Sequence, residues 1–367
     1  MKRLVAGLAV VAASAALVGC GQHPFVPATA IAYVQHAKTA KLPAPLLGVD
    51  VYSETNYSKA DTTTYGTRVI SYIKKSLTAQ VVGLMWDLCS PSFKSDTISA
   101  CRTNTKTGTG TMSAADISTL AGIAKRDGLQ VEMRPIIRVG PSAGWSNPHV
   151  SWEGHIVPAN ETKWFQSLLQ AELPYLKVAK AVHAEQFVVG SELAGLKYSP
   201  SWMWFLGKAQ ADCGCQVSYS AQDTQYLENS SNLPPIKALG TDLYPALNLP
   251  ASASQARVTA GWDESLASVS ESRLDRTSLD EVSIRGTVGA YQHPATWNDT
   301  GKADPTVQVR YFTAACTAVA HYHMRALFFY FVPLFDDPAN PTPFAAYFVK
   351  TPGSQAIAEC RSILAKG

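Results

Sequence analysis

Short apolar stretches alternate with longer stretches of helical periodicity over most of the chain. Eight of the short stretches are apolar almost without interruption, as in strands that are buried on both faces of a parallel sheet. They are residues 46–52, 80–87, 129–137, 186–192, 216–221, 238–244, 282–289 and 325–332. Between them, apolar residues return every three or four positions, which predicts crossover helices. These cover residues 64–77, 113–126, 160–183, 202–212, 263–270, 306–323 and 354–365, and 223–237 is the weakest of the set.

Eight strand and helix units predict an α/β fold with a single (β/α)8 TIM barrel over residues 46–367. A doubly wound sheet, whose usual strand count is five or six, is the less suitable alternative. The first expected strand is not followed by Gly-x-Gly-x-x-Gly, and the sequence contains no phosphate-binding P-loop. We therefore expect no cofactor. In a barrel the reaction takes place at the carboxyl ends of the strands.

The N-terminal segment has the features of an export signal. Lys2 and Arg3 precede an apolar run over residues 4–17, which is too short to span a bilayer. The run ends in Leu17-Val18-Gly19-Cys20, which resembles the lipobox of bacterial lipoproteins. We expect a signal peptide over residues 1–19, a lipid on Cys20, an Ala/Pro-rich tether over residues 20–45, and export to the cell envelope with a lipid anchor in the membrane. The alternative is a plain secretory signal with a chance cysteine.

Charge and composition narrow the choice of partner. The formal charge is +3, and removal of Lys2 and Arg3 brings the chain close to neutral, so no nucleic-acid partner is expected. The chain holds 15 Tyr, 8 Trp and 12 Phe, which suits a sugar-binding groove, although most aromatic residues belong to a core. We expect a monomer that binds a carbohydrate.

Six cysteines remain after Cys20, an even number that suggests disulfides in an exported protein. Cys89 with Cys101 would close a short loop, and Cys316 with Cys360 would join the last two expected helices. Cys213 and Cys215 are then left as a pair. Zinc is the rival for that pair, but no matching Cys or His pair lies nearby in the sequence. We expect no metal site.

Side chains suited to carbohydrate chemistry stand at the expected strand ends. Glu192 ends the fourth expected strand, after an apolar run and Gly190-Ser191, although a solvated loop residue or a helix cap would look the same. Carboxylates beside aromatic rings at a barrel mouth are what glycoside cleavage needs. The expected substrate-binding residues at the other strand ends and in the loop after the third strand are Trp86, Asp87, Arg134, Trp145, Trp152, Asp242, Tyr244 and Tyr330.

The chain also resembles glycoside hydrolase family 113, a family of β-mannanases with a (β/α)8 fold and a retaining mechanism. The resemblance runs through Arg134-Pro135, Gly144-Trp145, Trp152-Glu153-Gly154 and residues 160–165 to Gly190-Ser191-Glu192-Leu193, and on to residues 241–244. Gly190-Ser191-Glu192-Leu193 corresponds to the family's Gly-x-Glu-Leu. The resemblance implies that Glu192 is the acid/base and that Trp152, Asp242 and Tyr244 line the sugar subsites.

The nucleophile is the point of departure from the family. Alignment of the seventh strand puts Thr287 where the family has a glutamate, and a threonine hydroxyl needs an activating base to replace it. Glu281 lies six residues upstream, roughly 20 Å along a strand, so we expect it near the opposite end of the barrel. Asp87, Asp242 and Asp336 or Asp337 are better placed to support an inverting mechanism.

Two hypotheses therefore remain. In the first, the protein is a glycoside hydrolase with Glu192 as general acid/base. In the second, it is a glycan-binding lipoprotein on a hydrolase scaffold that no longer cleaves. An unrelated barrel enzyme is a third, weaker alternative, since a fold alone does not fix an activity.

Overall fold

The protein is described by a computed structural model over residues 44–53, 55, 57–103, 110–140, 152–228, 233–296, 301–344 and 346–367. The chain divides into two units, Met1–Lys41 and Leu42–Gly367, and only the second is described here. The expected signal peptide, Cys20 and most of the expected tether lie outside the described residues, as does Trp145.

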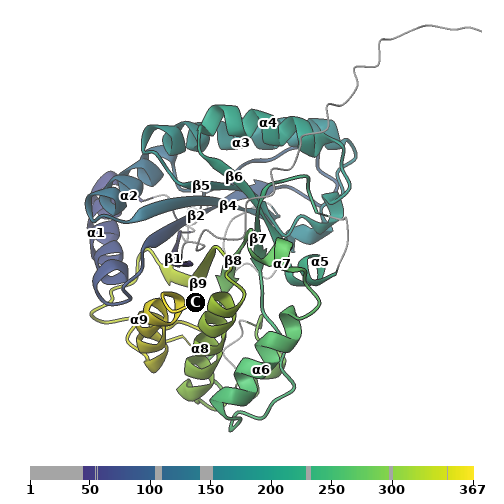
Figure 1. The fold of residues 1–367 in the computed structure, drawn as a ribbon. Coiled ribbons are helices and arrows are strands. Elements are labelled where there is room, and N and C mark those ends of the chain that lie inside the picture. The colour runs from purple at the N-terminus through teal and green to yellow at the C-terminus, as the bar shows by residue number, and fades with distance from the viewer. Residues whose placement is uncertain are drawn as a thin grey trace, which may run out of the picture. The chain divides into compact units, whose positions relative to one another are not determined.

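Eight parallel strands close into a barrel at the centre of this unit, as Figure 1 shows. In order around the barrel they are β1 (Leu46–Ser53), β2 (Val81–Ser90), β4 (Gln130–Val139), β5 (Gln186–Ser191), β6 (Gln216–Gln222), β7 (Ala238–Asp242), β8 (Thr277–Val282) and β9 (Ala326–Pro333). β1 pairs with both β2 and β9, which closes the barrel. A short strand, β3 (Ser99–Ala100), pairs antiparallel with β2. The predicted (β/α)8 barrel is thus confirmed.

Helices follow the strands and form an outer ring (Figure 1). They are α1 (Lys59–Lys75), α2 (Ala114–Arg126), α3 (Glu161–Ala181), α4 (Ser201–Cys213), α5 (Asp223–Leu227), α6 (Gln255–Leu266), α7 (Glu271–Leu274), α8 (Pro305–His321) and α9 (Pro352–Leu364). Three 3-10 turns, η1 (Glu153–His155), η2 (Ala194–Leu196) and η3 (Ala290–Gln292), lie in loops that follow strands. Within the described residues, no helix has the length and apolar character needed to cross a membrane.

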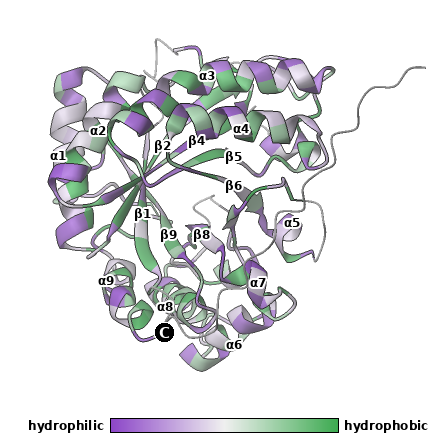
Figure 2. Cartoon of the chain, turned by 45° about the horizontal axis from the view of Figure 1, so that its top comes forward, coloured by the Kyte–Doolittle hydropathy of each residue, from purple (hydrophilic) through white to green (hydrophobic). Residues whose placement is uncertain are grey.

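Local sequence explains where the helices begin and which face they bury. The hydroxyls of Ser58 and Ser113 accept hydrogen bonds from the N–H groups of Asp61 and Asp116, so each serine caps a helix start. In Figure 2, α3 and α4 carry both hydrophobic and hydrophilic residues, as helices with one buried face should. The caps and the apolar faces together fix the helices on the outside of the barrel.

One expected strand is displaced. Strand β8 covers Thr277–Val282, so the prediction of a strand over 282–289 is wrong. Glu281 is the last residue but one of β8 and lies at the carboxyl end of the barrel, so its expected place at the opposite end is wrong too. The helix expected over 263–270 is also displaced, because α6 ends at Leu266 and α7 begins at Glu271.

Three strands contain one extra residue shortly before they reach the mouth. The register shifts in β5 between residues 188 and 191, in β8 between 279 and 282, and in β9 between 329 and 332. Such β-bulges bend a strand and redirect the side chains around them. The bulge in β8 allows two consecutive residues, Asp280 and Glu281, to interact with Arg134 in the barrel interior.

The six described cysteines pair as the sequence predicts. Cys89 bonds to Cys101 across the segment after β2, Cys316 bonds to Cys360 between α8 and α9, and Cys213 pairs with Cys215. The first of these disulfides lies at the carboxyl end of the barrel and the second lies between two outer helices.

Candidate active site

A single arginine, Arg134 of β4, ties together the strand ends at the barrel mouth. Its side chain is fully buried. Nε donates to the Ser191 hydroxyl at 2.8 Å, and Nη1 donates to the Asp280 carbonyl oxygen at 3.0 Å. Nη2 donates to Asp242 Oδ1 at 2.6 Å and lies 3.0 Å from Glu281 Oε1. One guanidinium therefore fixes the ends of β5, β7 and β8 relative to β4.

Two neighbours of Glu281 stabilise its charged form. Besides the ion pair with Arg134, the Tyr244 hydroxyl donates a hydrogen bond of 2.7 Å to Glu281 Oε2. The side chain stays 13% exposed, so it opens to the mouth. The pKa of Glu281 is raised to about 8, chiefly by burial and then by the charge of Asp242, while Arg134 and the Tyr244 hydrogen bond act in the opposite direction.

Glu192 follows β5 in the left-handed region of the backbone, with φ of 52°. Such a conformation is uncommon for a residue other than glycine and is concentrated at functional sites. The Trp152 indole N–H donates to Glu192 Oε2 at 2.5 Å. Burial, followed by the negative charges of Asp242, Glu153 and Glu281, raises the pKa of Glu192 well above its ordinary value. The surroundings of Glu192 therefore favour its protonated form.

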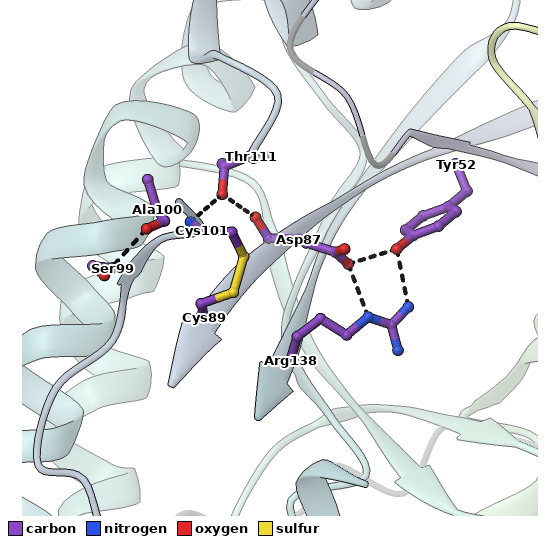
Figure 3. The surroundings of a disulfide bond; sticks show 8 residues. All are labelled: Tyr52, Asp87, Cys89, Ser99, Ala100, Cys101, Thr111 and Arg138. Carbon is purple, nitrogen blue, oxygen red and sulfur yellow. Dashed lines mark hydrogen bonds and ion pairs between the residues drawn. A yellow bond between two sulfur atoms is a disulfide. The ribbon is translucent and has the colours of Figure 1, made fainter. Parts of the chain in front are cut away.

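A second buried arginine organises the side of the mouth next to β1 and β2. Arg138 Nε donates to Asp87 Oδ1 at 3.1 Å, and its Nη2 donates to the Tyr52 hydroxyl at 3.0 Å. The Tyr52 hydroxyl in turn donates to Asp87 Oδ1 at 2.7 Å. Figure 3 shows the three side chains converging from neighbouring strands. They form a polar wall that sequence reasoning identified only at Asp87.

The Cys89–Cys101 disulfide connects to this wall through Thr111. The Cys101 N–H donates to the Thr111 hydroxyl at 2.7 Å, and that hydroxyl donates to the Asp87 carbonyl oxygen at 2.6 Å (Figure 3). The disulfide and the threonine therefore hold the backbone at Asp87, whose carboxylate binds Arg138.

Two of the expected site residues lie elsewhere. Trp86 is fully buried and stacks on Tyr175 of α3, with ring centroids 4.4 Å apart, so the prediction that it contacts substrate is wrong. Thr287 lies five residues beyond the end of β8, is 3% exposed, and forms an isolated bridge with Ala303. The other described members of the predicted set, Asp87, Arg134, Trp152, Asp242, Tyr244 and Tyr330, lie at the carboxyl end of the barrel.

Sequence reasoning missed four polar residues of the mouth: Tyr52, Arg138, Glu153 and Glu281. Tyr52 and Arg138 could have been found from their places at the ends of expected strands one and three. Glu281 could have been found by aligning strand ends, because its register partner on β7 is Asp242. Among the described residues, no group of three or more His, Cys, Asp or Glu side chains is arranged to hold a metal ion.

Exposed apolar side chains gather at the same end of the molecule. Among the described residues, the exposed large hydrophobic side chains lie in loops that follow strands or in the first turn of α4. They are Trp152, Val157, Tyr198, Met203, Trp204, Val288 and Phe335. We refer to these seven residues as the rim of the mouth.

The family model of Glycoside Hydrolase Family 113 matches residues 60–331. A solved GH113 β-1,4-mannanase is similar in structure, with a TM-score of 0.71 and 15% identity over 87% of this chain and 99% of that one. The GH113 β-mannanase of Alicyclobacillus acidocaldarius in complex with ManMIm gives 0.67 and 15%, over 88% and 98%. A family 5 mannosidase from Rhizomucor miehei gives 0.55 and 10%, over 89% and 94%.

No curated protein sequence matches the chain. The structural likenesses are at low identity and establish the fold, whereas the family match spans most of the barrel. The chain belongs to glycoside hydrolase family 113.

Proposed function

We propose that the protein is a retaining glycoside hydrolase in which Glu281 is the nucleophile and Glu192 is the general acid/base. The observation that carries the proposal is the ion pair between Arg134 and Glu281 at the mouth, next to Ser191 and Glu192. A retaining enzyme needs two carboxyl groups about 5 to 5.5 Å apart. With Glu281 present, the chain has no need of Thr287 as a nucleophile.

The two carboxyl groups would act in two steps. Protonated Glu192 gives its proton to the glycosidic oxygen while the Glu281 carboxylate attacks the anomeric carbon, so the C–O bond to the leaving sugar breaks and a glycosyl ester forms. Ionised Glu192 then takes a proton from water, which attacks the anomeric carbon and releases Glu281. The product keeps the anomeric configuration of the substrate.

The surroundings of each carboxyl group suit its step. Arg134 and the Tyr244 hydroxyl stabilise the anion of Glu281, which is the form that attacks. Glu192 has its pKa raised by burial and by three neighbouring carboxylates, which favours the protonated form. Arg134 and Tyr244 thus favour the anion of Glu281, whereas the neighbouring carboxylates favour the protonated form of Glu192.

The proposed substrate is a β-1,4-linked mannan or a related polysaccharide. The support is family membership together with the names of the similar structures, several of which are β-mannanases. The rim adds support, because aromatic side chains such as Trp152, Tyr198 and Trp204 stack on the flat faces of sugars. Several exposed aromatic rings suit a substrate of several sugars.

The test uses protein that begins after Cys20, incubated with mannan and a panel of other plant and bacterial polysaccharides. We expect release of reducing ends from at least one β-1,4-mannan, with retained anomeric configuration in the first product seen by proton NMR. A Glu264→Gln variant, changed at an exposed position of α6, should be as active as wild type. Absence of cleavage across the panel would contradict the proposal and favour the non-cleaving alternative.

We also infer that the protein is exported and anchored by a lipid on Cys20. The support is the Leu17-Val18-Gly19-Cys20 sequence after an apolar run, together with disulfides, which form in oxidising compartments. Cys20→Ser should move the protein from the membrane fraction to the soluble fraction and leave its melting temperature unchanged. Continued association of this variant with membranes would contradict the anchor.

A further inference from the structure

Glu153 is a buried carboxylate of the mouth to which the two-step reaction assigns no role. It begins the turn η1, in the loop that joins β4 to α3, and follows Trp152, the donor to Glu192. The next residue is Gly154, where a Cβ would lie 2.2 Å from the Trp152 ring. The turn therefore requires a glycine so that the indole can lie across it, and this fixes the position of Glu153 beside Trp152.

The turn η1 also packs closely on η2, the turn that follows Glu192. A Cβ at Gly195 of η2 would lie 2.3 Å from the carbonyl oxygen of Ile156, which caps η1. Glycine permits this close backbone approach. Because the two turns touch, Glu153 is held in a fixed position relative to Glu192.

The Glu153 side chain is buried near the two carboxyl groups of the proposed reaction. It is only 7% exposed, yet its charge acts on Glu192 and on Glu281. Among the described residues, the only hydrogen bond to its carboxylate comes from its own backbone N–H. Burial raises its pKa to about 7, while the positive charge of Arg138 acts in the opposite direction. Since no described side chain donates to it, the Glu153 carboxylate can accept hydrogen bonds from a bound group.

We propose that Glu153 binds the sugar at the reaction centre by accepting hydrogen bonds from its hydroxyl groups. The inference rests on the proposed function and adds a substrate-binding residue to it. A sugar ring presents neighbouring hydroxyls, and two of these can reach the two oxygens of one carboxylate. Trp152, fixed by the same turn, offers its 37% exposed ring to the same sugar. A single loop segment would thus supply a stacking surface, a hydrogen-bond acceptor and the donor to Glu192.

The experiment measures binding separately from cleavage. Mannohexaose is titrated calorimetrically into Glu281→Gln protein, which should bind without turnover, and into the same protein carrying Glu153→Gln or Glu153→Asp. Loss of hydrogen bonds to a charged acceptor should weaken binding by about 10- to 100-fold in the Gln variant. The Asp variant keeps the charge on a shorter side chain and should lose less affinity. Glu264→Gln on the same background is the control.

The possible outcomes separate the role of Glu153 from the proposed function. Weakened binding with an unchanged melting temperature supports the inference, and in the cleaving enzyme Glu153→Gln should then raise KM more than it lowers kcat. Unchanged affinity in the Gln variant, with only a shifted pH profile of kcat, would overturn the inference and leave the proposed function standing. Absence of both binding and cleavage of every glycan tried would overturn the proposed function and this inference with it.

Discussion

Two groups of carboxylates lie inside the barrel at different heights. Those at the mouth include Glu192 and Glu281, which are partly exposed and are bound by donors from other strands or loops, Trp152 and Arg134. Those of the interior are Asp50, Glu132 and Asp280, which are nearly or fully buried. In both groups burial is the largest cause of a raised pKa, but only the mouth group can meet a substrate.

Two aspartates of the interior group have room because the strand next to each of them carries a glycine. A Cβ at Gly83 would lie 2.0 Å from Asp50 Oδ1, and one at Gly240 would lie 1.7 Å from Asp280 Oδ2. Neither Asp50 oxygen has a hydrogen-bond partner within the described part of the chain. A buried carboxylate of this kind stays neutral, because charging it without a partner costs far more than protonating it.

The comparison is sharpest on β8, where consecutive residues belong to different groups. Asp280 accepts a hydrogen bond from the Ser278 hydroxyl inside the barrel, whereas Glu281 reaches Arg134 and Tyr244 at the mouth. The bulge lets both side chains face inward at different heights. Access to the mouth, and not burial or pKa alone, therefore distinguishes a candidate catalytic carboxylate from a structural one.

The largest expected effect separates these two neighbours. Glu281→Gln should lower kcat on the order of 10³-fold or more, because the proposed glycosyl ester forms on the Glu281 carboxylate and an amide does not attack the anomeric carbon. Asp280→Asn should keep kcat within about tenfold and act on stability. The measurement is release of reducing ends by both variants at matched protein concentration, with urea unfolding to check that each is folded. Equal loss of activity in both variants would break the distinction.

Removal of each long-range disulfide compares a bond at the mouth with a bond between the outer helices. Loss of the Cys316–Cys360 bond, which encloses 44 residues, should cost about 1 kcal/mol more stability than loss of Cys89–Cys101, which encloses 12. Each loss alone should cost about 3 to 4 kcal/mol. Only the Cys89→Ser/Cys101→Ser variant should raise KM, because Thr111 then no longer holds Asp87 firmly. A raised KM after loss of the Cys316–Cys360 bond, and not of the Cys89–Cys101 bond, would contradict this prediction.

Substitution of Asp50 tests whether the interior carboxylates make the stability of the protein depend on pH. Its pKa is raised in the folded protein, chiefly by burial, so the stability that its neutral form provides is complete below the ordinary pKa of about 4 and is lost as pH rises toward the folded-state pKa. Asp50→Asn removes that loss, which amounts to as much as about 1.4 kcal/mol per pH unit. Urea unfolding at pH 5 and 8 measures it. The exposed Asp275→Asn variant should show no such difference.

The smallest effect concerns the ionisation of Glu281. Its anion must attack while Glu192 is protonated, so kcat/KM should follow a bell in which Glu281 gives the acidic limb. The Tyr244 hydrogen bond lowers the pKa of Glu281, so Tyr244→Phe should move the acidic limb to higher pH. An unchanged acidic limb would mean that another group controls it.

The sequence predicts the barrel well because seven of its eight strands are long apolar runs bounded by polar turns. The prediction fails for the remaining strand, β8, and the reason is physical. The bulge places Asp280 and Glu281 directly after Leu279, so the acidic pair looks like the loop before a strand and shifts the expected strand downstream. The true end of β8 becomes visible only when its register with β7 is known.

The site residues, like the strands, divide into those that the hydrophobic pattern reveals and those that it does not. Glu192 was predicted because a glycine and a continuous apolar run precede it. Trp86 was misassigned because an apolar strand buried on both faces does not reveal which residues face inward. Met85 clusters with Tyr52 inside the barrel, while Trp86 packs against α3. That alternation is set by barrel closure and not by the hydrophobic pattern.

The central claim is that Glu281 is the nucleophile, and trapping of the covalent intermediate tests it most directly. The protein is incubated with 2-deoxy-2-fluoro-β-mannosyl fluoride, digested, and sequenced by tandem mass spectrometry. A label on Glu281, and its absence in Glu281→Gln protein, is the predicted result. A label on Thr287 or on another carboxylate, or hydrolysis with inversion and no label, would contradict the account.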